Sequence, residues 1–291
     1  MARGPNGAVL VTGASTGIGR ATALELVRRG HRVFAGVRKR ADGEALKEAA
    51  EGELVPVNLD VAKERSIAAA RRKVQRAVGG DGLQALVNNA GVADAGPIEH
   101  VPVEDFRSVI EVNLVGQYAV TQAFLPLIRR GAGRVVFLSS IGGLVASPFM
   151  AAYSASKFGV EALADSLRRE VRPWGIDVVV VEPGSIATPI WERGARTVDS
   201  RKPSREATRM YGKQVEAMRE GLIATGESGI EPDRVAKVIV RALRARRPRT
   251  RYLVGADAKW GRRLSRITSD RLFDRMIRRS YALPDDAPPA R

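Results

Sequence analysis

The sequence predicts an α/β fold in which a doubly wound parallel sheet of about seven strands carries helices on both faces. Short apolar runs alternate along the chain with segments of helical periodicity, which is the order of βαβ units. Glycine-rich or polar residues follow several of these runs, as they do where parallel strands end at a crevice. The 291 residues, 44% of them hydrophobic, are enough to bury the core of such a sheet.

Composition excludes several classes of function. The chain has no cysteine, which excludes disulfides, thiol catalysis and thiolate-bound metals. Its two histidines, His31 and His100, are too few for a histidine-based triad or zinc site, so we predict no metal. The net charge of +16 comes from 48 basic residues, nine of them lysine, without a zinc finger or other nucleic-acid motif. We therefore predict no nucleic-acid partner.

The sequence contains no pattern for membrane insertion or export. No apolar run approaches the roughly 18 residues of a membrane span. Residues 1–7 lack the apolar core of a signal peptide. We expect a cytoplasmic protein.

The first predicted strand, residues 8–11, runs directly into a glycine-rich turn and a helix that stops at Gly30. Gly13 allows a tight turn, while Gly17 and Gly19 let backbone approach a ligand and let the helix pack closely. Backbone N–H groups at the start of such a helix can bind a pyrophosphate. The alternative is a plain strand-to-helix loop.

The second predicted strand, residues 32–36, ends where a βαβ unit meets the adenosine ribose of a dinucleotide. An acidic residue there would accept a hydrogen bond from the 2′-hydroxyl of NAD, but this chain has Val37. Arg38 can instead pair with a 2′-phosphate, which favours NADP. The alternative for Arg38 is a solvated basic turn.

A short helix around residues 45–50 and a third strand over residues 54–58 come next. Asp60, just after that strand, can accept a hydrogen bond from an adenine amino group. The alternative is that Asp60 caps a helix beginning near Lys63.

The fourth predicted strand, residues 83–87, ends in the small and polar residues 88–91. A long helix over residues 103–129 then carries Asn113 between two apolar residues. A buried amide demands partners. We consider two compatible roles, a structural hydrogen bond to the backbone and support of a water in a proton relay.

A fifth strand, residues 133–138, leads to Ser140, and Tyr153 and Lys157 follow on a predicted helix. Four residues apart on a helix, the Tyr and Lys side chains share one face, with Cβ atoms roughly 5–6 Å apart. A neighbouring ammonium favours the phenolate and lowers a phenol pKa from about 10 toward the working range. The 13 residues from Ser140 to Tyr153 let both hydroxyls face one carbonyl oxygen. The alternative is a chance Tyr and Lys pair on a helix surface.

A sixth strand, residues 177–182, ends at Pro183 and Gly184, which let backbone pass close to a flat ring. Thr188 can hydrogen-bond a carboxamide or a phosphate.

In this order, residues 8–190 closely resemble the short-chain dehydrogenases/reductases. The resemblance depends on the turn at residues 12–19, on residues 88–91, on Asn113, and on the Ser140, Tyr153 and Lys157 set with the turn at residues 183–188. It implies a Rossmann-type domain over residues 1–255 and hydride transfer between a nicotinamide and an alcohol or carbonyl. Many NADP-binding members place a second basic residue where this chain has Thr16, so use of NAD stays open.

The resemblance also implies residue roles. Tyr153 is then the general acid/base, Ser140 holds the substrate oxygen, and Lys157 lowers the phenol pKa and binds the nicotinamide ribose. Asn113 supports the water relay. The implied cofactor contacts are Gly13, Ser15, Gly17, Ile18 and Gly19 at the pyrophosphate, Asp60 and Val61 at the adenine, Asn88, Ala90 and Gly91 on the adenosine side, and Pro183, Gly184 and Thr188 at the nicotinamide.

Beyond Pro189 the chain leaves the shared pattern. Residues 190–229 are predicted to form a lid, with a polar loop at residues 200–204 and then a helical run. A helix over residues 232–246 and a seventh strand over residues 251–254 follow.

Residues 256–291 are predicted to be a basic extension with helices near residues 259–267 and 269–281 and a disordered tail at 284–291. Its apolar side can lie on an anionic membrane, but packing on the lid or on a subunit interface is favoured.

These patterns predict an oxidoreductase for a small-molecule alcohol or ketone. The stretch from residue 133 to 157, followed by residues 182–184, resembles the branch that acts on hydroxysteroids and retinoids, which implies a lipophilic substrate; a non-lipid carbonyl is the alternative. A non-catalytic nicotinamide-binding sensor is disfavoured, because Ser140, Tyr153 and Lys157 are all present. The resemblance implies a homodimer or homotetramer formed through the helices at residues 103–129 and 154–172.

Overall fold

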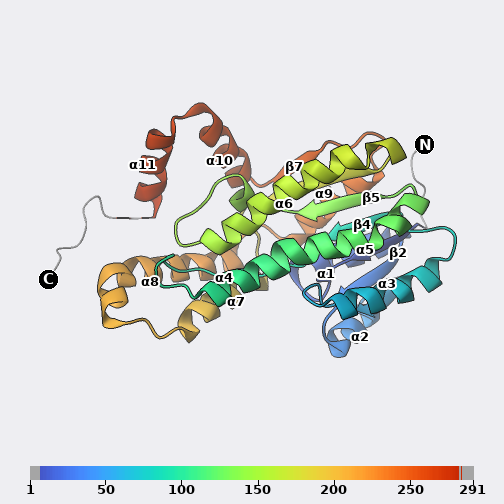
Figure 1. Cartoon of the computed structure of the whole chain (residues 1–291), viewed down its shortest axis with the longest axis horizontal. Helices are drawn as coiled ribbons and strands as arrows, with labels where there is room; N and C mark the ends of the chain where they lie inside the picture. The colour runs from blue at the N-terminus through green and yellow to red at the C-terminus, as the bar shows by residue number, and fades with distance from the viewer. Residues whose placement is uncertain (1–6, 282, 284–291) are drawn as a thin grey trace.

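The computed structural model describes residues 7–281 and 283 and is built on a sheet of seven parallel strands (Figure 1). The strand order is β3-β2-β1-β4-β5-β6-β7, so the chain leaves β1 first toward one edge and then, from β4, toward the other. This confirms the predicted fold class. The strands are β1 Ala8–Val11, β2 Arg32–Val37, β3 Leu54–Asn58, β4 Ala85–Asn88, β5 Arg134–Leu138, β6 Asp177–Pro183 and β7 Arg251–Val254.

Helices connect these strands and cover both faces of the sheet (Figure 1). Up to β6 they are α1 Gly17–Arg28, α2 Arg40–Glu48, α3 Glu64–Val78, α4 Val103–Ile110, η1 Glu111–Val115, α5 Gly116–Arg130, η2 Ile141–Gly143, α6 Ala151–Glu170 and η3 Arg172–Trp174. After β6 they are α7 Pro189–Ser200, α8 Arg205–Ser228, α9 Pro232–Arg244, α10 Ala256–Ile267 and α11 Asp270–Ser280.

Alternation along the strands produces two hydrophobic cores. In β1, Val9 and Val11 point into the core that α1 and α9 cover, while Leu10 points into the core that α3, α5 and α6 cover. All three side chains are fully buried. Because both faces are covered, the strands are largely apolar, as parallel strands usually are.

Two details after β2 differ from the sequence analysis, namely the start of the short helix and the alternative considered for Asp60. Helix α2 begins at Arg40, before the predicted residues 45–50, because Gly43 lies inside the helix rather than in a loop. A Cβ at Gly43 would lie 2.8 Å from Pro56 Cβ, so glycine lets α2 pack directly on β3. Asp60 does not cap α3, whose N-cap is Lys63; its Oδ1 accepts a hydrogen bond from Ala62 N at 3.2 Å.

The long helix predicted over residues 103–129 is continuous but not uniform. A π-helical segment, η1, separates α4 from α5 and contains the buried Asn113. Such segments re-aim side chains within a helix and often occur at functional sites. The periodicity of the sequence does not reveal this insertion.

The region predicted as a lid is almost entirely helical. Helix α7 occupies the first part, residues 201–204 form the connection, and α8 follows. The Ser204 hydroxyl accepts a hydrogen bond from Ala207 N at 3.0 Å and so caps α8. We call residues 189–228 the α7–α8 segment.

The last two helices project from one end of the molecule (Figure 1). Helix α10 contacts β7 and η2, and α11 contacts α10. Trp260, Ile267, Leu272 and Met276 remain exposed, so packing of these side chains on the lid is not seen among the described residues. Packing on a subunit interface stays a prediction. The tail predicted to be disordered, residues 284–291, lies outside them. No described helix is long and apolar enough to cross a membrane.

Candidate active site

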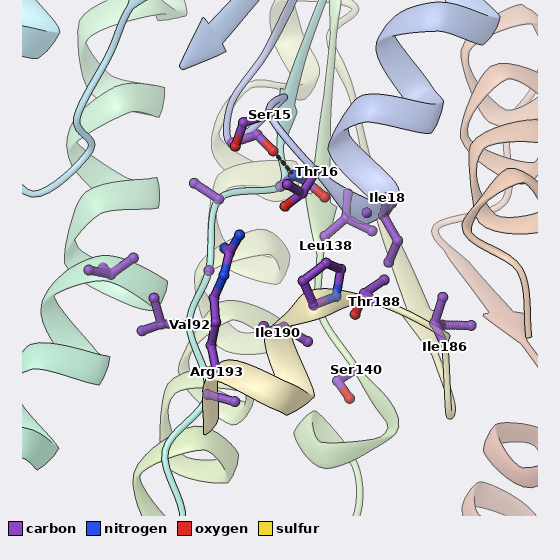
Figure 2. Close-up of a pocket in the computed structure, with 18 of the residues that line it drawn as sticks. Ser15, Thr16, Ile18, Val92, Leu138, Ser140, Ile186, Thr188, Ile190 and Arg193 are labelled. Atoms are coloured by element: carbon purple, nitrogen blue, oxygen red, sulfur yellow. Dashed lines mark hydrogen bonds between the residues drawn. The ribbon is translucent and has the colours of Figure 1, made fainter. Parts of the chain in front are cut away.

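A cavity opens at the carboxyl ends of the central strands, between the neighbouring parallel strands β1 and β4, where the order of the strands switches from one side of β1 to the other (Figure 2). Ligands bind at this point in doubly wound sheets. Most of the residues selected from the sequence line it, namely Gly13, Ser15, Gly17, Ile18, Arg38, Asp60, Val61, Ala90, Gly91, Ser140, Tyr153, Lys157, Pro183, Gly184 and Thr188.

Three of the selected residues do not line the cavity. Asn88 is fully buried and its Nδ2 donates to Thr121 Oγ1 at 2.8 Å, so it joins β4 to α5. Gly19 serves packing, since a Cβ there would collide with Gly13 O and with Asn89 Nδ2. Asn113 is fully buried and is not among the residues that line the cavity.

The turn after β1 is shaped to accept an anion. Gly13 and Gly17 have φ of +62° and +53°, which favours glycine, and a Cβ at Gly17 would lie 3.0 Å from Thr188 Cγ2. The first turn of α1 has no acidic residue, and its N-cap Thr16 forms no side-chain capping bond. The N–H groups and the positive end of the α1 dipole are thus available to a phosphate. This region fits the pyrophosphate of a dinucleotide.

Thr12 and Asn89, which we did not select from the sequence, fix the separation of β1 and β4. The Thr12 hydroxyl accepts from Asn89 N at 2.9 Å and from Ala90 N at 3.0 Å. Asn89 Nδ2 donates to Thr12 O at 2.9 Å and to Gly13 O at 3.0 Å. The sequence could have indicated both residues, because each comes directly after an apolar strand. These bonds hold the frame of the cavity.

Tyr153 and Ser140 share one wall of the cavity. Tyr153 lies in the first turn of α6 and is 7% exposed. The Ser140 hydroxyl accepts from Gly142 N at 3.1 Å, and a Cβ at Gly142 would lie 3.1 Å from Tyr153 Cε1. Glycine in η2 therefore lets the turn approach the tyrosine ring. The two hydroxyl-bearing residues are brought together as the sequence analysis anticipated.

The electrostatics of Tyr153 differ from the expectation. Burial raises the pKa of its phenol, and the hydrogen bond with Ser140 only opposes that rise. The Lys157 Nζ lies 5.6 Å from the Tyr153 ring centroid and donates to Leu138 O at 2.8 Å. Burial also lowers the pKa of Lys157 to about 8, with Glu161 opposing the change. Desolvation of both groups therefore outweighs the expected effect of the amine on the phenol.

Asn113 makes the structural hydrogen bonds that we considered for it. Its Oδ1 accepts from Val92 N at 2.8 Å, and its Nδ2 donates to Val92 O at 2.9 Å and to Ser156 Oγ at 3.0 Å. Ser156 precedes Lys157 on α6. The amide thus ties the segment after β4 to α6, one residue before Lys157.

Arg38 extends from the end of β2 at the edge of the cavity. It is exposed, while Val37 beside it is buried. Its backbone oxygen accepts from Asn58 Nδ2 at 3.2 Å, and no acid of the described residues forms an ion pair with its guanidinium. An anion bound at this edge could pair with the Arg38 guanidinium.

The family model for short chain dehydrogenases matches residues 7–198. The chain belongs to the short-chain dehydrogenase/reductase family. This short-chain dehydrogenase is 36% identical to 17-beta-hydroxysteroid dehydrogenase type 6 from Bos taurus, over 96% of this chain and 90% of the relative. It is 38% identical to retinol dehydrogenase 16 from Mus musculus (86% and 81%) and 32% identical to the NADPH-dependent 3-dehydrocapnine reductase of Ornithobacterium rhinotracheale (92% and 95%).

Solved structures agree with this assignment. A short-chain dehydrogenase from Streptomyces avermitilis superposes with a TM-score of 0.77 at 26% identity, over 97% of this chain and 100% of that one. One from Burkholderia cenocepacia, in complex with NADP, has a TM-score of 0.71 at 25% identity, over 96% and 99%. The predictions of family, hydroxysteroid and retinol dehydrogenase-like branch, NAD(P) use and oxidoreductase activity on CH–OH groups are confirmed.

Beside Tyr153, this short-chain dehydrogenase carries an apolar cluster. Met150, Met218 and Leu222 are buried there with the Tyr153 ring. The Trp191 ring lies 5.8 Å from that ring, tilted by 59°, and its Nε1 donates to Ile186 O at 2.9 Å. The sequence analysis missed Trp191 and Arg193, because it left residues 190–199 without a predicted helix.

Proposed function

We propose that this short-chain dehydrogenase interconverts a lipophilic secondary alcohol and its ketone, with Tyr153 as general acid/base and NADP(H) as the preferred cofactor. The observation that carries the proposal is the position of Tyr153 on the wall of the cavity, where it hydrogen-bonds Ser140 and its ring belongs to the apolar cluster. A polar pair at one end and a buried apolar surface at the other suit a carbonyl attached to a hydrocarbon body.

The proposed chemistry divides the work between two hydroxyl groups. When bound, a reduced nicotinamide supplies the hydride that reaches the carbonyl carbon. The negative charge that then develops on the carbonyl oxygen is stabilised by hydrogen bonds from Ser140 and Tyr153. The Tyr153 proton passes to that oxygen and gives the alcohol, and the phenol regains a proton from solvent. Burial raises the pKa of Tyr153, so the phenol starts protonated, which favours reduction of the ketone.

Lys157 and Asn113 support this site. The Lys157 ammonium lies one helical turn after Tyr153, where it can bind the nicotinamide ribose and stabilise the phenolate formed during turnover. Asn113 holds α6 against the segment after β4, and a relay of water beside it remains part of the proposal.

Relatives that bear steroid and retinol names support a lipophilic substrate. The apolar side chains of the α7–α8 segment, including Trp191, Met218 and Leu222, support it independently. We propose that this segment is a lid, because it covers Tyr153. A panel of steroid, retinoid, sugar and short-chain alcohols and ketones with each cofactor tests the assignment; turnover confined to sugars would contradict it.

The test of the catalytic role is Tyr153→Phe. We expect the variant to fold and bind NADPH, but to lose turnover by about 10²–10⁴ or more. Tyr281→Phe, at a tyrosine at the end of α11 and outside the cavity, is the matched control and keeps full activity. Turnover of Tyr153→Phe within a few-fold of the wild type would contradict the acid/base assignment. If instead no substrate is found and NADPH still binds, the sensor alternative is favoured.

We also propose a homodimer or homotetramer in the cytoplasm. Phe106, Val115, Tyr118 and Phe158 are exposed on the helices α4 to α6, where the resemblance implied an interface. Sedimentation equilibrium and cell fractionation test these two points.

A further inference from the structure

One face of α7 lies along the cofactor cavity and carries a positive charge. Ile190, Arg193 and Thr197 are three and four residues apart, which puts them on the same side of the helix, and all three line the cavity. In Figure 2 the Arg193 side chain runs upward, with its nitrogen atoms ending toward Ser15 and Thr16 of the glycine turn.

The Arg193 guanidinium has no acidic partner among the residues that the structure describes. Its neighbours on the segment differ: Arg196 pairs with Glu192 at 3.1 Å, and Arg201 pairs with Asp94 at 2.5 Å and Asp105 at 2.9 Å. Arg193 points into a cavity rather than to a carboxylate.

The opposite wall of the cavity is the start of α1, where the helix dipole is positive. The first turn of α1 has no acid, and Thr16 does not cap it. The uncapped N–H groups and the guanidinium therefore face the same space from two sides. An anion bound between these two groups could accept hydrogen bonds from both of them.

We propose that Arg193 forms an ion pair with the pyrophosphate of the bound cofactor, so that α7 provides the second half of the pyrophosphate site. The inference rests on the NAD(P) use of the family and on the proposed function. Arg193 is aimed at the glycine turn, whereas Arg38 stands at the end of β2, where a 2′-phosphate is expected. The two arginines thus bind different phosphates of NADP(H).

This ion pair links the cofactor to the cover of the active site. Arg193 is two residues from Trp191, whose ring lies against Tyr153. Because α7 carries both side chains, a bound dinucleotide holds Trp191 over Tyr153. Cofactor binding is therefore coupled to closure of α7.

The experiment compares the affinities of the purified full-length chain for NADPH and NADH, by fluorescence titration. We expect Arg193→Ala to weaken both cofactors by a similar factor of about 10–100, the usual range for a hydrogen-bonded ion pair. Arg193→Lys should recover part of the lost affinity, because lysine keeps the positive charge but cannot form the two parallel hydrogen bonds of a guanidinium. Arg38→Ala weakens NADPH alone, and Arg196→Ala, on the same helix but paired with Glu192, changes neither.

Hydrogen exchange of residues 189–200 gives a second readout. NADPH should protect these amides in the wild type and in Arg196→Ala, and much less in Arg193→Ala under equal saturation. Unchanged affinity of Arg193→Ala for both cofactors would overturn the inference, and so would weakening of NADPH alone, which would assign Arg193 to the 2′-phosphate. A wild type that binds neither cofactor would instead defeat the proposed function.

Discussion

At the scale of single residues, burial controls the charges at the site. Lys157 is 4% exposed, and its ammonium is satisfied chiefly by Leu138 O. Burial lowers the pKa of this amine to about 8. An amine whose pKa is lower in the folded than in the unfolded state destabilises the fold at every pH at which it remains protonated.

Lys157→Met should therefore alter the pH dependence of stability. The folded pKa lies below the ordinary value of 10.5, so the unfolded chain binds more protons between pH 8 and 10.5. The Lys157 contribution is unfavourable below pH 8 and is relieved as the pH rises toward 10.5. From pH 7 to pH 9.5 the free energy of unfolding of the wild type should rise by on the order of 2 kcal/mol relative to that of Lys157→Met. Urea unfolding of both proteins at several pH values measures this, and parallel pH profiles would contradict it.

At the scale of elements, Arg201 anchors the α7–α8 segment to the body of the protein. Its Nη2 lies 2.5 Å from Asp94 and 2.9 Å from Asp105, and its Nη1 donates to Ala95 O. Asp94 is 5% exposed. These bonds join the end of α7 to the loop after β4 and to α4.

Removing the guanidinium should loosen this segment. Arg201→Ala leaves the buried Asp94 carboxylate without its partner, which costs about 1–3 kcal/mol or more. We expect faster hydrogen exchange, by a factor of about 10 or more, in α7 and α8 but not in the sheet. Arg219→Ala is the control, because Arg219 pairs with Asp199 and Glu216 in more exposed positions. Equal exchange in the two variants would show that Arg201 is not an anchor.

At the scale of the whole molecule, a buried ionic network joins four elements around Glu182. This carboxylate on β6 is fully buried and lies 3.3 Å from Arg251 of β7 and 3.3 Å from Arg262 of α10. Arg251 also pairs with Glu161 and Asp165 of α6, each at 3.0 Å. The extension is thereby tied to the strand that ends at Pro183.

The network predicts a second pH dependence. Burial, and next the negative charge of Glu161, raise the pKa of Glu182 to about 7. The positive charges of Arg262, Arg251 and Arg266 lower this pKa but do not cancel the rise. Since this folded pKa lies above the ordinary 4.5, the stability it contributes is complete below pH 4.5 and lost as the pH rises through 7. The wild type should be about 1 kcal/mol more stable at pH 6 than at pH 8 relative to Glu182→Gln. Denaturant titrations at the two pH values test this; an identical response of the variant would contradict it.

Much of the site could be predicted because it is local in the sequence. The glycine turn follows β1 directly, and Tyr153 and Lys157 are four residues apart on one helix. The difference at α2 shows the limit: a glycine inside a helix resembles a loop until Pro56 is seen packed against it.

By itself, the sequence determined the order of the seven strands and the glycine turn and selected the proposed catalytic residues, since hydrophobic periodicity and backbone requirements act between near neighbours. Only the tertiary structure decided the upward shift of the Tyr153 pKa, the cavity-facing side of Arg193 and the network around Glu182. Burial and ion pairing depend on residues up to about a hundred positions away, and a linear pattern does not state which of those residues come together.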